Sequence, residues 1–195
     1  GYTIQPYSPA AGTGLSSHEL NMPGAYKEIK DISAVAQFKI KGTENEYFLA
    51  WTTTPWTLPS NTAVALGKNI TYVKVRTYNR YTQEPIVVIL AKDRLSAYFS
   101  EAKPDLKPEE IKPGNKPYPY IEIVEEIGGA DLEGLEYEQL LPYVQSDKPA
   151  FKALLGDFVS TEDGTGIVHI APTFGADDFK VAREYDIPPL MVKDE

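Results

Sequence analysis

The stretch between residues 50 and 61 holds the side chains best suited to binding a ligand. It reads AWTTTPWTLPSN and places four threonines, two tryptophans and two prolines within twelve residues. The aromatic-rich run at 47–51 leading into it predicts a buried β-strand. Pro55 lacks a backbone N–H and favours an extended residue before it, so the strand should end there. These polar side chains are therefore expected at the mouth of a sheet.

The threonines of this stretch should form a ledge. Side chains alternate along a strand, so Thr52 and Thr54 should point to one face and Thr53 to the other. Prolines on either side stiffen the turn that carries Trp56. We expect hydroxyl groups beside an indole ring, an arrangement that suits a polar, planar ligand. The structural alternative is a β-branched strand end followed by a proline turn.

Two further candidate ligand-binding residues lie in the last thirty residues of the sequence. Asp178 falls in the first turn of a helix predicted at 177–185, where the helix dipole favours an ionised carboxylate. Such a carboxylate is a good partner for an ammonium group. The alternative is a pair of helix-capping aspartates, and we expect Asp177 to take that structural part. His169 occupies a strand predicted at 166–170; a satisfied structural histidine is its alternative interpretation.

Mostly short strands must position these residues. A hairpin is predicted from 33–40 through a turn at 42–45 into the threonine strand. The alternating run 70–76 predicts a half-exposed strand, and the apolar run 86–91 a buried one. Residues 121–127 alternate like a strand, although a helix is also compatible with them.

The remaining segments are predicted to form a short helix, an irregular stretch and a second hairpin. Residues 92–101 predict a short helix, and five prolines within 103–119 predict an irregular excursion. The turn-forming residues 162–165 predict a hairpin between 158–160 and 166–170. Many short strands with few helices predict a mixed β and α fold, a closed or nearly closed β-barrel with peripheral helices.

The amino-acid composition excludes several classes of site and partner. At 195 residues we expect one globular domain over 26–195, preceded by an extended arm at 1–25. The chain has no cysteine and two histidines, so we expect no metal site. No apolar run approaches a membrane span, and we expect no membrane partner. The net charge of −9 argues against a free-standing nucleic-acid binder and favours a pocket. The last residues, VKDE, suggest a piece excised from a larger cytoplasmic protein, which we expect to be a monomer.

Three motifs resemble a known family. The segment WTTTPWTLPSN at 51–61 resembles the threonine-rich signature in the editing domain of isoleucyl-tRNA synthetases. The related valyl and leucyl enzymes have an arginine where this chain has Thr54. The segments GTGIVHIAP at 164–172 and FGADD at 174–178 also match, in the family's order. GADLEGLEY at 129–137 resembles a linking segment of the three relatives. Together the matches cover most of residues 26–178.

The resemblance implies a β-barrel editing domain with an activity and a site. The activity would be hydrolysis of the ester in valyl-tRNA(Ile), and of valyl-adenylate, within an isoleucine–tRNA ligase. Asp178 would bind the ammonium of the amino acid, and His169 would form a wall of its pocket. Residues 52–54 would contact the terminal ribose and the scissile bond, with Thr53 and Thr54 counted as catalytic. Trp56 and Asn61 would contribute further substrate contacts.

The same resemblance implies the partners. The substrate would be the 3′ aminoacylated end of tRNA(Ile), presented by the remainder of the synthetase chain. No cofactor is expected in this part, since ATP and Mg²⁺ belong to the synthetic site of the parent enzyme. With no cysteine nucleophile and no clear Ser-His-Asp spacing, direct attack by water is the simplest mechanism.

Two other functions stay open at this point. One is a serine-type hydrolase that uses His169, Asp178 and one of the hydroxyl residues. The other is a non-catalytic β-barrel module that binds a nucleoside, with Trp56 as its stacking surface.

Overall fold

The computed structural model describes residues 7–8, 12–14, 33–114, 117–146 and 148–191. The chain divides into two units, residues 1–32 and residues 33–195. In the first unit, β1 (Tyr7–Ser8) and β2 (Thr13–Gly14) form a short antiparallel pair. The boundary predicted between residues 25 and 26 lies outside the described residues and stays a prediction.

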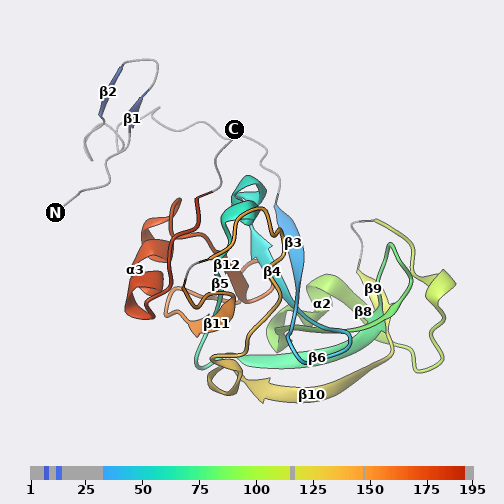
Figure 1. Ribbon diagram of the computed structural model, residues 1–195. Helices are drawn as coiled ribbons and strands as arrows, with labels where there is room; N and C mark the ends of the chain where they lie inside the picture. Colours follow the sequence, from blue (N-terminus) through green and yellow to red (C-terminus); the bar gives the residue numbers. More distant parts are fainter. Residues whose placement is uncertain (1–6, 9–11, 15–32, 115–116, 147, 192–195) are drawn as a thin grey trace, which may run out of the picture. The chain divides into compact units, whose positions relative to one another are not determined.

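The second unit is built on one mixed sheet of eight strands (Figure 1). Its order is β10-β6-β7-β4-β12-β5-β11, with β3 also paired to β4. The bounds are β3 (Ala34–Lys39), β4 (Glu46–Thr52), β5 (Ala63–Leu66), β6 (Thr71–Tyr78), β7 (Pro85–Ala91), β10 (Glu122–Gly128), β11 (Lys152–Leu155) and β12 (Ile167–Ile170). The pairs β4–β7, β4–β12 and β5–β11 are parallel, and the others are antiparallel.

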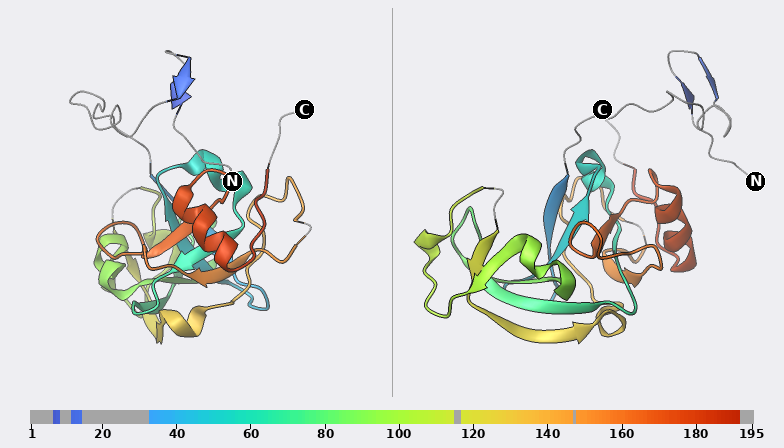
Figure 2. Two further views of the ribbon diagram at one scale, coloured as in Figure 1. Left: turned by 90° about the vertical axis from the view of Figure 1, so that its left-hand side faces the viewer. Right: turned by 180° about the vertical axis from the view of Figure 1, so that it is seen from behind.

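This sheet curls into a half-barrel (Figures 1 and 2). Within the described residues no ladder joins its end strands β10 and β11, so the barrel is not closed. Isolated bridges lie beside the opening, where Ile40 pairs with Tyr137 and Glu136 pairs with Lys152. The prediction of a mixed β fold with few helices is confirmed, whereas a closed barrel fits only in part.

Helices in the described residues are short. They are η1 (Pro55–Ser60), η2 (Lys92–Arg94), α2 (Leu95–Tyr98), η3 (Pro108–Glu110), η4 (Gly129–Leu132) and α3 (Ala176–Glu184). A separate parallel pair joins β8 (Phe99–Ala102) to β9 (Tyr118–Tyr120). The helix predicted at 92–101 is therefore too long, because the chain turns extended at Phe99 to pair with β9.

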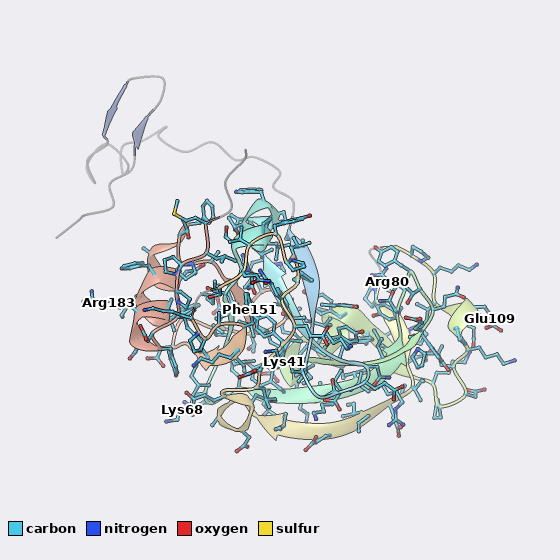
Figure 3. The ribbon with its side chains drawn as sticks, viewed as in Figure 1. Lys41, Lys68, Arg80, Glu109, Phe151 and Arg183 are labelled. Atoms are coloured by element: carbon cyan, nitrogen blue, oxygen red, sulfur yellow. The ribbon has the colours of Figure 1, made fainter. Side chains whose placement is uncertain are left out.

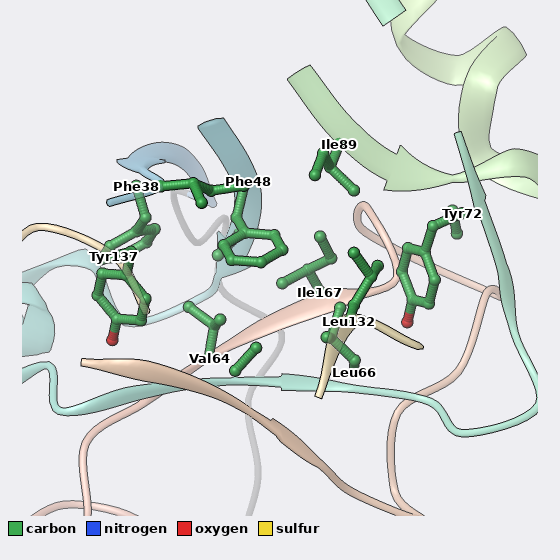
Figure 4. Packing of buried hydrophobic residues seen from close by; sticks show 13 residues of the cluster. Phe38, Phe48, Val64, Leu66, Tyr72, Ile89, Leu132, Tyr137 and Ile167 are labelled. Atoms are coloured by element: carbon green, nitrogen blue, oxygen red, sulfur yellow. The ribbon is translucent and has the colours of Figure 1, made fainter. Parts of the chain in front are cut away.

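Three apolar clusters hold these layers together. The central cluster fills the inside of the curled sheet and includes Phe38, Tyr72 and Tyr137 (Figure 4). A second cluster packs Val181 and Ala182 of α3 against β5, β11 and β12. The third packs α2, β8 and β9 against β4, β6 and β7. Arg183 on α3 and Arg80 in the β6–β7 loop mark the two ends (Figure 3).

Most strand predictions are confirmed, including the β3–β4 hairpin and the strands predicted at 70–76, 86–91 and 121–127, which are β6, β7 and β10. The hairpin predicted between 158–160 and 166–170 is wrong. Residues 158–160 form no strand, and β12 pairs instead with β5, about one hundred residues earlier. The guanidinium of Arg94 donates hydrogen bonds to the carbonyl oxygens of Glu162 and Gly164 in this loop.

Candidate functional site

The threonine ledge forms where β4 meets η1. The strand ends at Thr52, and Pro55 starts the short helix. The Oγ1 of Thr52 accepts the backbone N–H of Thr54 at 3.0 Å and lies 3.3 Å from its hydroxyl. Thr53 is exposed. Thr52 and Thr54 are thus hydrogen bonded to each other, as expected of side chains on one face, but all three threonines line the same cavity.

This ledge lines a cavity of about 360 Å³, which we call the threonine cavity. Its lining residues are Trp51, Thr52, Thr53, Thr54, Trp56, Thr57, Val168, His169, Phe174, Gly175 and Asp178. The volume lies in the range usual for small-molecule sites. Trp56 and Phe174 are 65% and 61% exposed, so aromatic rings stand at its open side. The structure thus brings together every predicted site residue except Asn61.

Asp178 contributes a carboxylate from the first turn of α3. Its Oδ2 accepts the backbone N–H of Ala171 at 2.8 Å. A Cβ added at Gly175, the residue before the helix, would come within 2.9 Å of the Asp178 carboxyl carbon, so glycine leaves room for the carboxylate. No side chain caps this helix, and the capping role expected of Asp177 is wrong. Asp178 makes the backbone contact instead.

The electrostatics of Asp178 differ from the sequence prediction. Burial raises the pKa of its carboxyl, and the charge of Asp177 adds to this, while the hydrogen bond from Ala171 opposes it. Desolvation therefore outweighs the hydrogen bond from Ala171, and the pKa is raised where we expected ionisation to be favoured. A cationic ligand beside Asp178 would reverse this balance, because an opposite charge favours the ionised form.

His169 is buried in the wall of the cavity and both of its ring nitrogens have partners. Its Nε2 lies 2.9 Å from the hydroxyl of Thr57, and its Nδ1 lies 2.8 Å from the amide nitrogen of Asn61. The Thr57 hydroxyl donates to the carbonyl oxygen of Thr54 at 2.7 Å. Burial lowers the pKa of His169 to about 4, so the imidazole is neutral at pH 7.

The orientation of the Asn61 amide decides which nitrogen of His169 carries the proton. The Asn61 Nδ2 donates to the carbonyl oxygen of Ala63 at 2.8 Å, which identifies it as the nitrogen. An amide nitrogen can only donate, so the facing Nδ1 of His169 must accept. The proton of the neutral ring is therefore on Nε2 and is donated to Thr57.

Asn61 was expected to contact the ligand, and the structure places it elsewhere. It is 3% exposed and absent from the cavity lining. Its Oδ1 accepts the hydroxyl of Tyr137 at 2.5 Å. Asn61 thus lies behind His169, and any effect on a ligand must pass through the imidazole.

Sequence reasoning missed Thr57 and Tyr137. Thr57 follows Trp56 inside the threonine-rich motif, and its place on the first turn after Pro55 was an available signal. Tyr137 belongs to the segment 129–137, but nothing local in that segment points to His169. Within the described residues, no group of three histidine, cysteine or acidic side chains is placed to hold a metal ion. No described helix is long and apolar enough to cross a membrane.

Comparison with solved structures identifies the fold. The editing domain of the P. knowlesi cytosolic leucyl-tRNA synthetase superposes with a TM-score of 0.57 at 16% identity, covering 79% of this chain and 62% of that one. The P. falciparum counterpart gives a TM-score of 0.51 at 16% identity, covering 72% and 47%. At such identities the likeness concerns the fold, which is that of synthetase editing domains.

Comparison of sequences identifies the family, although no family model matches the chain. The isoleucine–tRNA ligase of Cytophaga hutchinsonii is 63% identical over 199 residues, and that of Porphyromonas gingivalis is 53% identical over 203. That of Clostridium tetani is 42% identical over 195 residues. Each match covers 100% of this chain but only 16–18% of the relative's length. The chain therefore matches isoleucyl-tRNA synthetases at high identity over its whole length and corresponds to a fragment of them.

Proposed function

We propose that this chain is the proofreading domain of an isoleucyl-tRNA synthetase. It would hydrolyse the ester bond of mischarged valyl-tRNA(Ile), and also valyl-adenylate, and so release valine. The observation that carries the proposal is the threonine cavity. It gathers Thr52, Thr53, Thr54, His169 and Asp178 in one hollow, on an editing-domain fold.

The need for such a site follows from the size of the amino acids. One methylene in an apolar pocket is worth only about 1–3 kcal/mol, and the discrimination of isoleucine from valine is the standard example of this limit. A synthetase therefore requires a second, hydrolytic step that accepts the smaller amino acid. That step needs an anchor for the ammonium, hydroxyls at the scissile ester and a wall against the larger side chain.

The cavity offers a group for each requirement. Asp178 would hold the ammonium group, and that contact would further favour its ionised form. The hydroxyls of Thr53 and Thr54 would position the water and the ribose. The water oxygen attacks the ester carbonyl, the bond to the ribose oxygen breaks, and that oxygen takes a proton. Trp56 would cover the open side, and His169 would limit the amino-acid pocket.

The geometry disfavours a serine-type hydrolase. In that mechanism a histidine nitrogen must accept the proton of the nucleophilic hydroxyl. Here the Nε2 of His169 already carries a proton and donates it to Thr57. Asp178 bonds to the backbone of Ala171. A nucleoside-binding module without catalysis would need the stacking surface of Trp56 but would assign no role to the half-buried carboxylate of Asp178.

The remainder of the synthetase would supply most of the tRNA affinity, because a domain with a net charge of −9 opposes the phosphate backbone. This domain would receive the 3′ end alone. ATP and Mg²⁺ would serve the synthetic site elsewhere in the parent chain. We place the parent enzyme in the cytoplasm as a monomer, with its editing domain spanning residues 26–195.

The experiment compares two neighbouring carboxylates in the synthetase that contains this segment. Asp178→Ala should lower deacylation of valyl-tRNA(Ile) by about 10- to 100-fold or more, because a charge-assisted contact is worth roughly 1.5–3 kcal/mol. Aminoacylation should be unchanged. Asp177→Ala, which alters an exposed residue next in sequence, is the control. Normal proofreading by the Asp178 variant would overturn the role of this carboxylate.

A further inference from the structure

A chain of hydrogen bonds runs from the apolar core to the wall of the threonine cavity. It links Tyr137 to Asn61, Asn61 to His169, and His169 to Thr57, with distances of 2.5, 2.8 and 2.9 Å. The residues come from three parts of the chain that are far apart in sequence. Only His169 and Thr57 line the cavity, so the other two act from behind it.

Tyr137 is the fixed end of this series of hydrogen bonds. Its ring is fully buried between Phe38 and Phe151, with edge-on contacts at centroid distances of 5.1 and 6.1 Å. Its backbone N–H donates to the carbonyl oxygen of Phe151 at 2.8 Å. In Figure 4 the ring of Tyr137 lies beside Phe38 at the edge of the central cluster. Packing and backbone pairing therefore hold the hydroxyl in one place.

The Tyr137 hydroxyl selects the orientation of the Asn61 amide. Burial raises the pKa of Tyr137 well above its usual range, so the hydroxyl keeps its proton. The amide hydrogens of Asn61 are directed to Ala63 and His169, which leaves the Tyr137 hydroxyl to donate to the Asn61 oxygen. A flipped amide would point its oxygen at the Ala63 carbonyl and lose this bond.

We propose that Tyr137 and Asn61 are positioning residues that hold His169 as the neutral, Nε2-protonated tautomer and fix its ring in the cavity wall. A protonated ring would turn its Nδ1–H against the amide hydrogens of Asn61, and a rotated ring would lose the bond to Thr57. The other titratable group of the described residues that faces the cavity is Asp178.

The consequence for specificity rests on the proposed function. A wall that rejects isoleucine must resist displacement by one methylene, so its stiffness matters more than its attraction. The bonds of Asn61 and Thr57 on opposite sides of the imidazole supply that stiffness. Loosening them from behind should change the ratio of isoleucyl to valyl ester hydrolysis without altering any group that touches the substrate.

Nuclear magnetic resonance tests the tautomer without any activity. The 195-residue chain has two histidines, and His18→Gln assigns the remaining ring signals to His169. At pH 7 the labelled ring should show a protonated Nε2 and a bare Nδ1. Asn61→Asp presents a carboxylate, which only accepts, so Nδ1 should become protonated. Tyr137→Phe, which keeps the ring, should give a mixture of both states. A protonated Nδ1 in the parent chain, or unchanged spectra in either variant, would overturn the proposal.

Ester hydrolysis in the whole synthetase tests the consequence. Tyr137→Phe should raise the ratio of isoleucyl to valyl deacylation about three- to tenfold, the size expected for one lost hydrogen bond. Tyr185→Phe, which removes a hydroxyl bonded to Glu133, is the control and should leave the ratio unchanged. An altered ring spectrum with an unaltered ratio would overturn the positioning role. If the parent enzyme hydrolyses neither ester, the proposed function fails, and the ring spectra still decide whether the tautomer is held.

Discussion

Two hollows on this unit differ in what lines them. The threonine cavity, about 360 Å³, brings hydroxyls, an imidazole and a carboxylate together. A larger one of about 510 Å³, which we call the aromatic cleft, lies between the β3–β4 hairpin and the α2, β8 and β9 elements. Its lining residues are Ser33, Val35, Gln37, Leu49, Trp51, Arg80, Tyr81, Ala97, Tyr98, Phe99 and Tyr118.

The polar groups of the two hollows are organised differently. In the threonine cavity, hydrogen bonds link Thr52 to Thr54, Thr54 to Thr57, and Thr57 to His169. In the aromatic cleft the guanidinium of Arg80 stacks on Tyr118 at 4.8 Å, and its buried Nε has no hydrogen-bond partner. Size alone would select the wrong hollow. Convergent polar groups with defined roles are the better sign of a reaction site.

Trp51 separates the two hollows and lines both. Its ring is packed against Gly164, where a Cβ would come within 2.6 Å of it, and the positive φ of 63° also favours glycine there. The wall between the hollows is therefore rigid. We expect changes in one hollow to leave the chemistry of the other intact, and the following variants test that separation.

Among the variants that compare the two hollows, His169→Ala should have the largest effect. Removing the imidazole opens room for one methylene, so the parent synthetase should hydrolyse correctly charged isoleucyl-tRNA about tenfold faster or more while still clearing valyl-tRNA. Deacylation of both esters, measured side by side, checks this. Loss of both activities would show that His169 is catalytic or structural. Unchanged rates would place the wall elsewhere, with Trp56 the next candidate.

The burial of His169 also predicts a pH dependence of stability. Its pKa is about 4 in the folded chain and about 6.5 when unfolded, so the folded state binds fewer protons between these values. The free energy of unfolding should therefore fall as pH drops from 6.5 to 4, by about 3 kcal/mol from this group. Urea unfolding of His169→Gln should lack this part of the slope. If the free energy of unfolding depends on pH in the same way in the parent and the variant, protonation of the His169 ring does not destabilise the fold.

Local signals in the sequence predicted part of this arrangement. The β3–β4 hairpin and α3 follow from turn residues and periodicity within a dozen residues, and the threonine ledge from Pro55 and strand alternation. The pairing of β12 with β4 and β5 could not be seen, because each partner is about one hundred residues away. The turn residues at 162–165 predicted that β12 would pair with the segment just before them. It pairs instead with the distant strands β4 and β5.

The candidate site shows the same limit. His169 and Asp178 were predicted through motifs, and their convergence with the threonines is a finding of the structure. Asn61 was assigned to the ligand because its motif contains it, yet its amide faces the back of His169. Tyr137 reaches Asn61 only because its backbone forms an isolated β-bridge with Ile40. No periodic pattern in the sequence predicts a contact between two residues so far apart.

A smaller effect is expected from Asp178→Asn on stability. The folded pKa of Asp178 is raised by burial, so its charged form destabilises the fold as pH rises above about 3.9. Asparagine keeps an oxygen for the Ala171 N–H and carries no charge. The variant should be more stable at pH 7 by less than about 1 kcal/mol, because solvent screens the exposed part of the carboxylate. The gain should vanish at pH 3, as urea midpoints at the two pH values would show. A loss at pH 7 would mean that the charge has a partner in the native fold.

The smallest effect on deacylation is expected in the aromatic cleft, from Arg80→Ala. The change removes a cation–π contact worth about 0.5–1 kcal/mol, and it also removes a buried Nε whose lost hydration costs about 1–3 kcal/mol. The two effects oppose, so the free energy of unfolding should stay the same or rise by up to about 2.5 kcal/mol. Valyl-tRNA deacylation should stay within about twofold of the parent rate, because Trp51 separates Arg80 from the threonines. Arg183→Ala, at the opposite end of the unit (Figure 3), is the matched control. A selective fall in deacylation with Arg80→Ala would show that the substrate extends past Trp51 into the cleft, and the separation of the two hollows would then be wrong.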